Sequence, residues 1–337
     1  MSSLNNNTNR QSTGGLTPRL ECVACLVRQA HEAVVSATTD PRLREAALRQ
    51  TLNLLAGMDW QLSPPALAQQ IHRLIRDVSR NPDPYAALKE RLNSRAEELY
   101  PVWHNRFRQK FNPLEAAVRL AIVGNLLDVG AKTQLSDGAV LAAFEDALTA
   151  PLLGSIAEFS EAIRSARHTL YLADNAGEIV FDRDLLAQLP LGNFTLVVRG
   201  APVLNDATLA DAQMAGLEDI CEVVSNGSDT PGTLLKDCSP EFRRRFEAAD
   251  LVIAKGQGNY ESLAGADKRI FFLLKVKCAV LAESLQCPCG SLVLHHQPAV
   301  GFKSDSPAMT STAATSAISL GSSSPGKFGR VTRPPGK

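Results

Sequence analysis

The second half of the chain alternates short β-prone runs with helical patterns, and this alternation constrains the fold more than any other feature. The runs span residues 169–173, 194–199, 220–224, 251–254 and 270–274. Strands that alternate with helices pair in parallel through right-handed crossovers. The sequence therefore predicts an α/β fold, a three-layer α/β/α, Rossmann-like and mostly parallel sheet.

The preceding part of the chain has a different pattern. Apolar residues recur at spacings of three and four in residues 41–58, 65–79, 113–130 and 138–150, which is typical of amphipathic helices. Prolines stand at plausible helix starts, where a missing N–H costs little: Pro41, Pro65 and Pro113. We therefore predict a helical N-terminal domain over 17–165, followed by an α/β domain over 166–300.

Both ends differ from the middle. Residues 1–16 are polar without a hydrophobic period, and the chain beyond about Lys303 is rich in Ser, Thr, Ala, Pro and Gly. Such segments cannot bury enough apolar surface to offset the entropy of ordering, so 1–16 and 301–337 are predicted to be disordered. The basic residues of the tail are scattered, and we interpret them as solubilising rather than as contacts to nucleic acid.

Composition excludes several classes of protein. The 337 residues carry no net formal charge and are 45% hydrophobic, so no overall field draws the chain to nucleic acid or to a membrane. No apolar run approaches about twenty residues, the length that a membrane-spanning helix needs. The seven cysteines are an odd number, which does not suggest a disulfide framework. These features favour a cytoplasmic protein with reduced thiols, and they leave its oligomeric state open.

Polar residues directly follow three of the predicted strands, in the segments 174–178, 200–208 and 255–261. In open parallel sheets, ligands bind outside the carboxyl ends of the strands, near a switch in strand order. We therefore expect the three segments to lie along one edge of the sheet.

Two of these segments carry hard oxygen ligands. Asp174, Asn175 and Asp206 offer two carboxylates and one amide carbonyl, a set that suits Mg, Mn or a similar divalent ion. The plainer alternative is that these residues cap a turn or a helix.

The third segment suits an anion. Lys255 supplies a cation, and Gly256 lets backbone N–H groups approach a ligand closely. Helices starting near Gly177 and Asn259 would direct their N–H groups to the same place. A metal, a lysine and free amides together are typical of a phosphoryl site, although the Lys-Gly-Gln-Gly-Asn sequence matches neither the Walker nor the dinucleotide glycine spacing.

Four motifs occur in order and together resemble a known family: YLADNAGEIVFD (171–182), VVRGAPVLNDATLADA (197–212), SDTPGTLLKDCSPEF (228–242) and DLVIAKGQGNYE (250–261). They are similar to the damage-control phosphatases, metal-dependent enzymes that share a fold with the ARMT-like acidic-residue methyltransferases. The resemblance covers about residues 20–295, and the KGQGN form resembles the prokaryotic branch.

The resemblance implies a divalent cofactor (Mn, Co, Ni or Mg) and a small phosphorylated metabolite as substrate. It implies metal ligation by Asp174, Asn175 and Asp206, and catalytic roles for Asp174, Glu178 and Asp206. It also implies a phosphate and substrate pocket that we assign to Gly177, Arg199, Lys255, Gly256 and Asn259. For Arg199, a purely structural pairing is an equal alternative.

Two further pairs of residues are candidates for a functional role. Asn125 and Asp128 are three apart in a helical pattern and share a face, either toward the cleft or as plain capping residues. Cys22 and Cys25 have metal-ligand spacing at a helix start and are candidates for a second metal or redox site, which Cys278, Cys287 and Cys289 could complete, although one such pair does not establish a site. The alternative is thiols without a metal.

The function that the sequence favours is a metal-dependent phosphatase, a phosphoric monoester hydrolase acting on small metabolites, with a role in metabolite damage control. One alternative is an S-adenosylmethionine-dependent carboxyl methyltransferase, but the acidic, amide-rich first turn suits a cation better than an adenosine. The other is a non-catalytic protein that binds a phosphometabolite. Attack by water and a phospho-aspartyl route through Asp174 both stay open.

Overall fold

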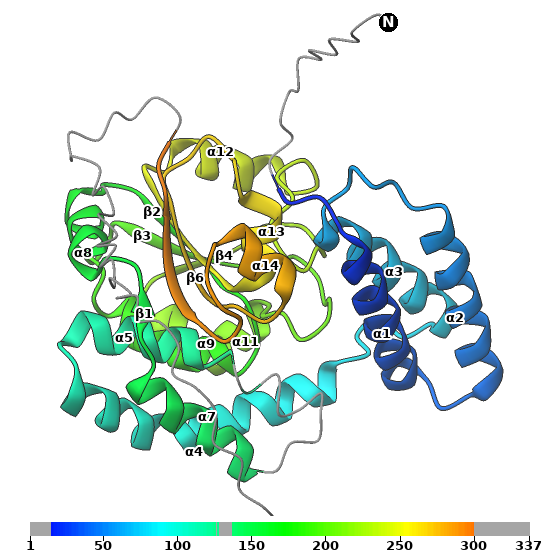
Figure 1. The fold of residues 1–337 in the computed structure, drawn as a ribbon, viewed down its shortest axis with the longest axis horizontal. Helices are drawn as coiled ribbons and strands as arrows, with labels where there is room; N and C mark the ends of the chain where they lie inside the picture. Colours follow the sequence, from blue (N-terminus) through cyan, green and yellow to red (C-terminus); the bar gives the residue numbers. More distant parts are fainter. Residues whose placement is uncertain (1–14, 126, 128–136, 300–337) are drawn as a thin grey trace, which may run out of the picture. The chain divides into compact units, whose positions relative to one another are not determined.

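The computed structural model describes residues 15–125, 127 and 137–299, all of them in one compact unit (Figure 1). Most of the two ends predicted to be disordered lies outside the described residues, as does Asp128. Gly15 and Leu16 do not fit that prediction. Gly15 N donates to the carbonyl of Ala264 at 2.7 Å, and Leu16 N donates to that of Glu261 at 2.8 Å. Gly15 and Leu16 therefore belong to the packed chain, because they are hydrogen-bonded to the end of the helix of residues 256–263 and to the residue after it.

Helices fill the first part of the chain, as predicted. They are α1 (Leu20–Ala37), α2 (Pro41–Ala56), α3 (Pro64–Ser79), α4 (Ala86–Lys110), α5 (Pro113–Val123), α7 (Asp137–Thr149) and α8 (Ile156–Ser165). Proline occupies the first turn of α2, α3 and α5, and the side chains of Asp40 and Asn112 accept from backbone N–H groups at the starts of α2 and α5.

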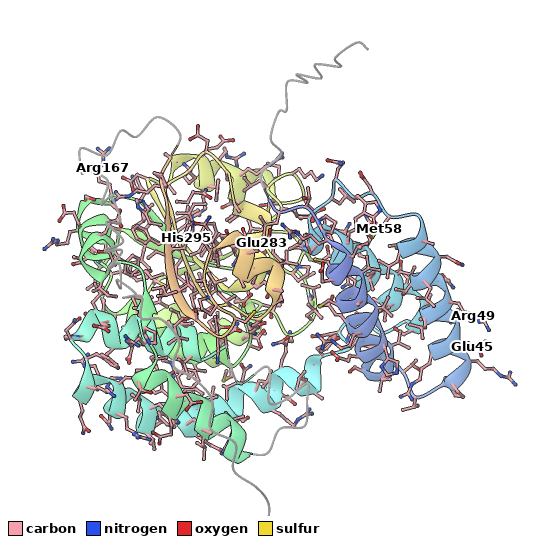
Figure 2. The ribbon with its side chains drawn as sticks, in the orientation of Figure 1. Glu45, Arg49, Met58, Arg167, Glu283 and His295 are labelled. Atoms are coloured by element: carbon pink, nitrogen blue, oxygen red, sulfur yellow. The ribbon has the colours of Figure 1, made fainter. Side chains whose placement is uncertain are left out.

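The first three helices pack together around a shared apolar cluster (Figure 1). On the outer side of α2, Glu45 and Arg49 point away from the other helices and form an exposed pair one turn apart (Figure 2). The longest of the described helices, α4, has Pro101 in its interior, and the sequence patterns did not predict it. None of the helices within the described residues combines the length and apolar composition that crossing a membrane requires.

Within the described residues, the sheet has seven strands in the order β1-β7-β6-β5-β2-β3-β4. Their bounds are β1 (Leu152–Leu153), β2 (Thr169–Leu172), β3 (Phe194–Val198), β4 (Glu222–Ser225), β5 (Leu251–Lys255), β6 (Ile270–Lys275) and β7 (Leu292–Gln297). Every pairing is parallel except that of β6 with β7. The α/β fold and the five predicted strands are confirmed, whereas β1, with two residues, and β7, with two histidines, were missed.

The remaining helices are short: α9 (Glu178–Phe181), α10 (Arg183–Leu186), α11 (Leu209–Met214), α12 (Pro240–Ala248), α13 (Gly256–Leu263) and α14 (Ala279–Ser284), with a 3₁₀ turn at Leu217–Asp219. Alternate residues of β2 belong to two different apolar clusters, Tyr171 to one and Leu170 and Leu172 to the other. The first cluster includes side chains of α4 and α5, and the second includes side chains of α12 and α13. The sheet is therefore covered on both faces, and the division into domains at residue 165 stays a prediction.

The strand order places a switch point beside β2. The chain runs from β2 outward through β3 and β4, and then returns to β5 on the other side of β2. The loop after β3 lies against the first helices, because Val203 and Leu204 belong to the same apolar cluster as side chains of α1, α2 and α3. Leu204 has a φ of 49°, an unusual backbone conformation for a leucine. The carboxyl ends of β2, β3 and β5 are thus where a ligand site is expected.

Candidate active site

The loops that follow β2 and β3 are joined by backbone contacts. Asn175 and Asp206 form an isolated antiparallel bridge. Ala176 N donates to the carbonyl of Asn205, and Ala207 N donates to that of Asp174, both at 2.8 Å. The structure thereby brings together the three predicted metal ligands, from positions up to 32 residues apart in the chain.

Asp174 lies at the centre of this group, with 9% of its surface exposed. Its Oδ2 accepts from Nδ2 of Asn125 at 2.9 Å and from Nδ2 of Asn175 at 2.8 Å. Burial raises the pKa of Asp174 well above its usual range, and the negative charges of Glu178 and Asp206 raise it further. A carboxylate in this position needs a nearby cation to stay ionised.

Arg199 supplies part of that positive charge. Its Nε donates to Oδ2 of Asp206 at 2.7 Å, and its Nη2 lies 4.0 Å from Oδ1 of Asp174. The side chain is 1% exposed, yet neither Nη1 nor Nη2 has a hydrogen-bond acceptor among the residues that the structure describes. Structural pairing with Asp206 is therefore present, and it leaves two N–H₂ groups available for a ligand.

Lys255 and Glu178 form a buried ionic network. The Lys255 ammonium donates to Oε1 of Glu178 at 2.8 Å and to Oδ1 of Asp182 at 2.6 Å, and the Tyr171 hydroxyl donates to the same oxygen of Asp182 at 2.8 Å. Burial lowers the pKa of Lys255, but the two carboxylates outweigh it and hold this pKa above its ordinary value. Burial raises the pKa of Asp182 to about 6.

Glu178 has no oxygen without a donor. Besides Lys255, it accepts through Oε2 from Nδ2 of Asn125 at 2.6 Å and from Nδ2 of Asn175 at 2.9 Å. The ammonium of Lys255, which the sequence suggested for a phosphate, is directed at carboxylates. The roles of Lys255 at a phosphate and of Glu178 in catalysis stay predictions.

Gly256 and Gly177 are required by close approaches. Gly256 has a φ of 79°, and a Cβ there would lie 1.8 Å from Oδ2 of Asp174. Gly177 has a φ of 74°, and a Cβ would lie 2.8 Å from the carbonyl oxygen of Leu92. Its N–H donates to Oδ1 of Asn93 at 2.6 Å. Only glycine allows the start of α13 to lie this close to the carboxylate of Asp174.

Asn259 links the strands to the loop that follows β4. Its Nδ2 donates to the carbonyl of Lys255 at 2.8 Å and to that of Ala173 at 3.2 Å, and its Oδ1 accepts from the hydroxyl of Thr233 at 2.8 Å. These contacts hold the ends of β2 and β5 together. A direct contact of Asn259 with phosphate stays a prediction.

The structure adds residues that sequence reasoning missed. Asn93 is a single buried asparagine on the long helix α4 and gave no signal in the sequence. Lys277 is exposed, and its charge lowers the pKa of Asp174. Asn226, buried directly after β4, has an Nδ2 group without an acceptor among the described residues. Asn125, by contrast, was singled out in the sequence and does reach the site.

The cysteines lie elsewhere. Cys22 and Cys25 are in the first turns of α1, Cys25 is exposed, and both thiols are free. Within the described part of the chain, no three side chains of His, Cys, Asp or Glu are placed to hold a metal. The second metal or redox site stays a prediction. The set of Asp174, Asn175 and Asp206 is of another kind, because one of its members is an amide.

The charges of the site fit a divalent cation. Four buried carboxylates, those of Asp174, Glu178, Asp182 and Asp206, are in contact with two buried cations, Arg199 and Lys255. When all four are ionised, their charge exceeds that of the two buried cations by two, and hard oxygen donors of this kind bind Mg, Mn and similar ions.

Fold and site together define a class: Rossmann-like proteins in which a carboxylate cluster and a partly unpaired arginine lie at the switch point of a parallel sheet. The family described as the damage-control phosphatase ARMT1-like domain matches residues 19–293. The chain belongs to this family.

Known relatives agree with this assignment. A protein named damage-control phosphatase from Pyrococcus horikoshii is 35% identical over 280 residues, which covers 81% of this chain and 96% of that protein. One from Archaeoglobus fulgidus is 33% identical, with the same two shares covered. A crystal structure of a DUF89 family protein from Pyrococcus horikoshii is 31% identical, with a TM-score of 0.74, and covers 83% of this chain and 99% of that one. The chain is thus a member of a family of phosphatases, which favours phosphate hydrolysis over methyl transfer.

Proposed function

We propose that the protein is a metal-dependent phosphoric monoester hydrolase that acts on small phosphorylated metabolites in metabolite damage control. The observation that carries the proposal is the pairing of two unmet requirements in one place. The excess of buried carboxylates favours binding of a cation. The two unpaired N–H₂ groups of Arg199 favour binding of an anion, and the nearer of them, Nη2, lies 4.0 Å from Asp174. A metal ion and a phosphate satisfy both.

Oxygens of Asp174, Asn175 and Asp206 would hold a divalent ion, either Mn, Co, Ni or Mg. When bound, such an ion neutralises charge on a phosphate and favours deprotonation of an attacking water. Asn175 fits this role because its Nδ2 is engaged with Asp174 and Glu178, which leaves its carbonyl oxygen to face a cation.

The protein's own groups prepare the site. Asn125 and Asn175 hold Oδ2 of Asp174, so that Oδ1 is the oxygen directed toward Arg199. Arg199, fixed by Asp206, binds an oxygen of the phosphate and stabilises the charge of the transition state. Glu178 accepts from three donors and so orients the two amides and Lys255.

The test is turnover of p-nitrophenyl phosphate with each of Mn, Co, Ni and Mg, before and after removal of metal with a chelator. Asp174→Asn and Asp206→Asn should each lower kcat/KM by about 100-fold or more, as for loss of a group that stabilises transition-state charge, and should weaken metal binding measured by calorimetry. Asp219→Asn, at an exposed position, is the matched control. Turnover that persists without metal, or wild-type rates in both site variants, would reject the proposal. Methyl transfer from S-adenosylmethionine, measured in parallel, should be absent.

A further inference from the structure

Several buried donor groups near the end of β3 have no acceptor. They are Nη1 and Nη2 of Arg199, Nδ2 of Asn226 and Nδ2 of Asn205, none of which has a hydrogen-bond partner among the described residues. All three side chains are at most 1% exposed. Buried donors are nearly always paired, so a group of unpaired ones in one region indicates a missing acceptor.

Arg199 and Asn226 occupy equivalent places on neighbouring strands. Val198 of β3 is paired with Ser225 of β4, and each of the two residues comes next in its own chain. Asn226 N donates to the carbonyl of Val198 at 2.9 Å. The two side chains therefore start from adjacent positions at the carboxyl ends of β3 and β4.

Both side chains leave the sheet on the same face. Side chains alternate between faces along a strand, so Arg199 shares a face with Val197, and Asn226 shares one with Val224. Val197 belongs to the apolar cluster of α12 and α13, and Val224 packs against that same cluster. Arg199 and Asn226 thus lie side by side, with their donor groups on one side of the sheet.

The amide of Asn226 is fixed in orientation. Its Oδ1 accepts from Gly200 N at 3.1 Å and from Ser228 N at 2.9 Å. If the amide were rotated by half a turn, its NH₂ group would face these two N–H donors, and both hydrogen bonds would be lost. The loop after β4 therefore fixes the direction in which the unpaired Nδ2 points.

That loop is itself held in place. Asp229 accepts from two side chains of α3, from Nε2 of Gln69 at 2.7 Å and from Nε of Arg73 at 3.0 Å. The loop begins the motif of residues 228–242, which carries part of the family resemblance but to which the proposed mechanism gives no role. The contacts of Asp229 with α3 hold the loop, and so keep Asn226 next to Arg199 even when no ligand is bound.

We propose that Arg199 and Asn226 together form the phosphate-binding subsite, in which the guanidinium and the amide donate to oxygens of one phosphate group. The ligand must offer hydrogen-bond acceptors, because the unpaired atoms are donors, and a phosphate offers several oxygens to a planar guanidinium. The subsite lies beside Asp174, whose Oδ1 is 4.0 Å from Nη2 of Arg199 and which keeps 9% of its surface exposed. The inference rests on the proposed function in that this phosphate is the one hydrolysed.

The test is Asn226→Asp, which keeps the size of the side chain and the oxygen that accepts from Gly200 and Ser228. It replaces the unpaired donor with a carboxylate oxygen beside Arg199, which then satisfies the guanidinium internally. Binding of inorganic phosphate is measured by calorimetry and by thermal shift, with chelator and no metal. The affinity should fall at least about tenfold, since a charged donor is neutralised, and the melting temperature without phosphate should be unchanged or higher.

Two further variants complete the experiment. Asn226→Ser removes the amide donor, adds no charge, and should weaken phosphate binding by about threefold to tenfold. Asn105→Asp makes the same change of charge at an exposed position of α4 and should bind phosphate as the wild type does. Wild-type phosphate affinity in both Asn226 variants, or no phosphate binding to the wild-type protein at millimolar concentrations, would overturn the subsite.

The experiment distinguishes a failure of the phosphate subsite from a failure of the proposed phosphatase function. Metal-dependent turnover by the wild-type protein, with phosphate affinity unchanged in the Asn226 variants, would reject the subsite and keep the phosphatase. Phosphate binding that depends on Asn226 in a protein without turnover would support the subsite and reject the hydrolase.

Discussion

Replacing Lys255 with methionine tests whether its main partners are the carboxylates seen in the structure. The lysine is fully buried and donates to Glu178 at 2.8 Å and to Asp182 at 2.6 Å. Lys255→Met retains most of the apolar stem but leaves two buried carboxylates without their cation. Removing one partner of a buried ion pair costs about 3–5 kcal/mol of unfolding free energy, so we expect a loss of this size near pH 8.

The loss should depend on pH in a defined direction. The pKa of Asp182 is about 6 in the folded protein and about 3.9 in an unfolded chain. A raised folded pKa contributes stability that is fully present below the unfolded pKa and is lost as pH rises through the folded pKa. Without Lys255, whose charge lowers the pKa of Asp182, this pKa rises further and the carboxyl group stays protonated at pH 5. The variant should therefore be much closer to wild type at pH 5 than at pH 8.

Urea unfolding of the wild type and of Lys255→Met at pH 5 and pH 8 measures both effects. Lys236→Met, at an exposed lysine, is the control and should change stability little at either pH. Adding Asp182→Asn to Lys255→Met should restore part of the stability lost at pH 8. A loss below about 1 kcal/mol at pH 8, the value typical of an exposed ion pair, or an equal loss at both pH values, would refute the buried-network account and return Lys255 to the role of phosphate ligand.

Two further predictions concern α13. Gly256→Ala should abolish most phosphatase activity, because its Cβ would lie 1.8 Å from Oδ2 of Asp174. The control is Gly265→Ala, which has nearly the same φ (80° against 79°) and no atom within 4 Å of the added Cβ, and which should therefore cost only the backbone strain. Equal kcat/KM in the two variants would contradict this prediction. Burial raises the pKa of Glu261 to about 7, so the stability of the wild type falls as pH rises from the pKa of the unfolded chain toward 7. Glu261→Gln can still accept from Gln257. This variant should be more stable than the wild type by about 1–3 kcal/mol at pH 8 and equally stable at pH 4.5. Urea unfolding at the two pH values checks it, and a variant less stable than wild type at pH 8 would show that the carboxylate is needed.

The sequence by itself determined the sheet and the place of the site. Strands β2, β3 and β5 were predicted from their β-prone runs. The polar residues that follow them, which include Asp174 and Asp206, lie together as parallel pairing requires. Strand pattern is a local property, and in an open parallel sheet it dictates which chain segments share an edge. The same logic missed β7, because a strand ending in two histidines and a glutamine carries little β-prone pattern.

What the sequence did not determine is which partner each polar group takes. Lys255 follows a strand and precedes glycines, which suits a phosphate, but the structure directs its ammonium to Glu178 and Asp182. Asn93 gave no signal at all, although it accepts from the N–H of Gly177. Partners such as these come from elements up to 84 residues apart, and a hydrogen bond depends on distances of a few tenths of an ångström that only tertiary packing fixes. Pattern therefore places a side chain at an edge of the sheet, and packing of α4 and α5 against that edge decides whether the side chain meets a ligand or another side chain.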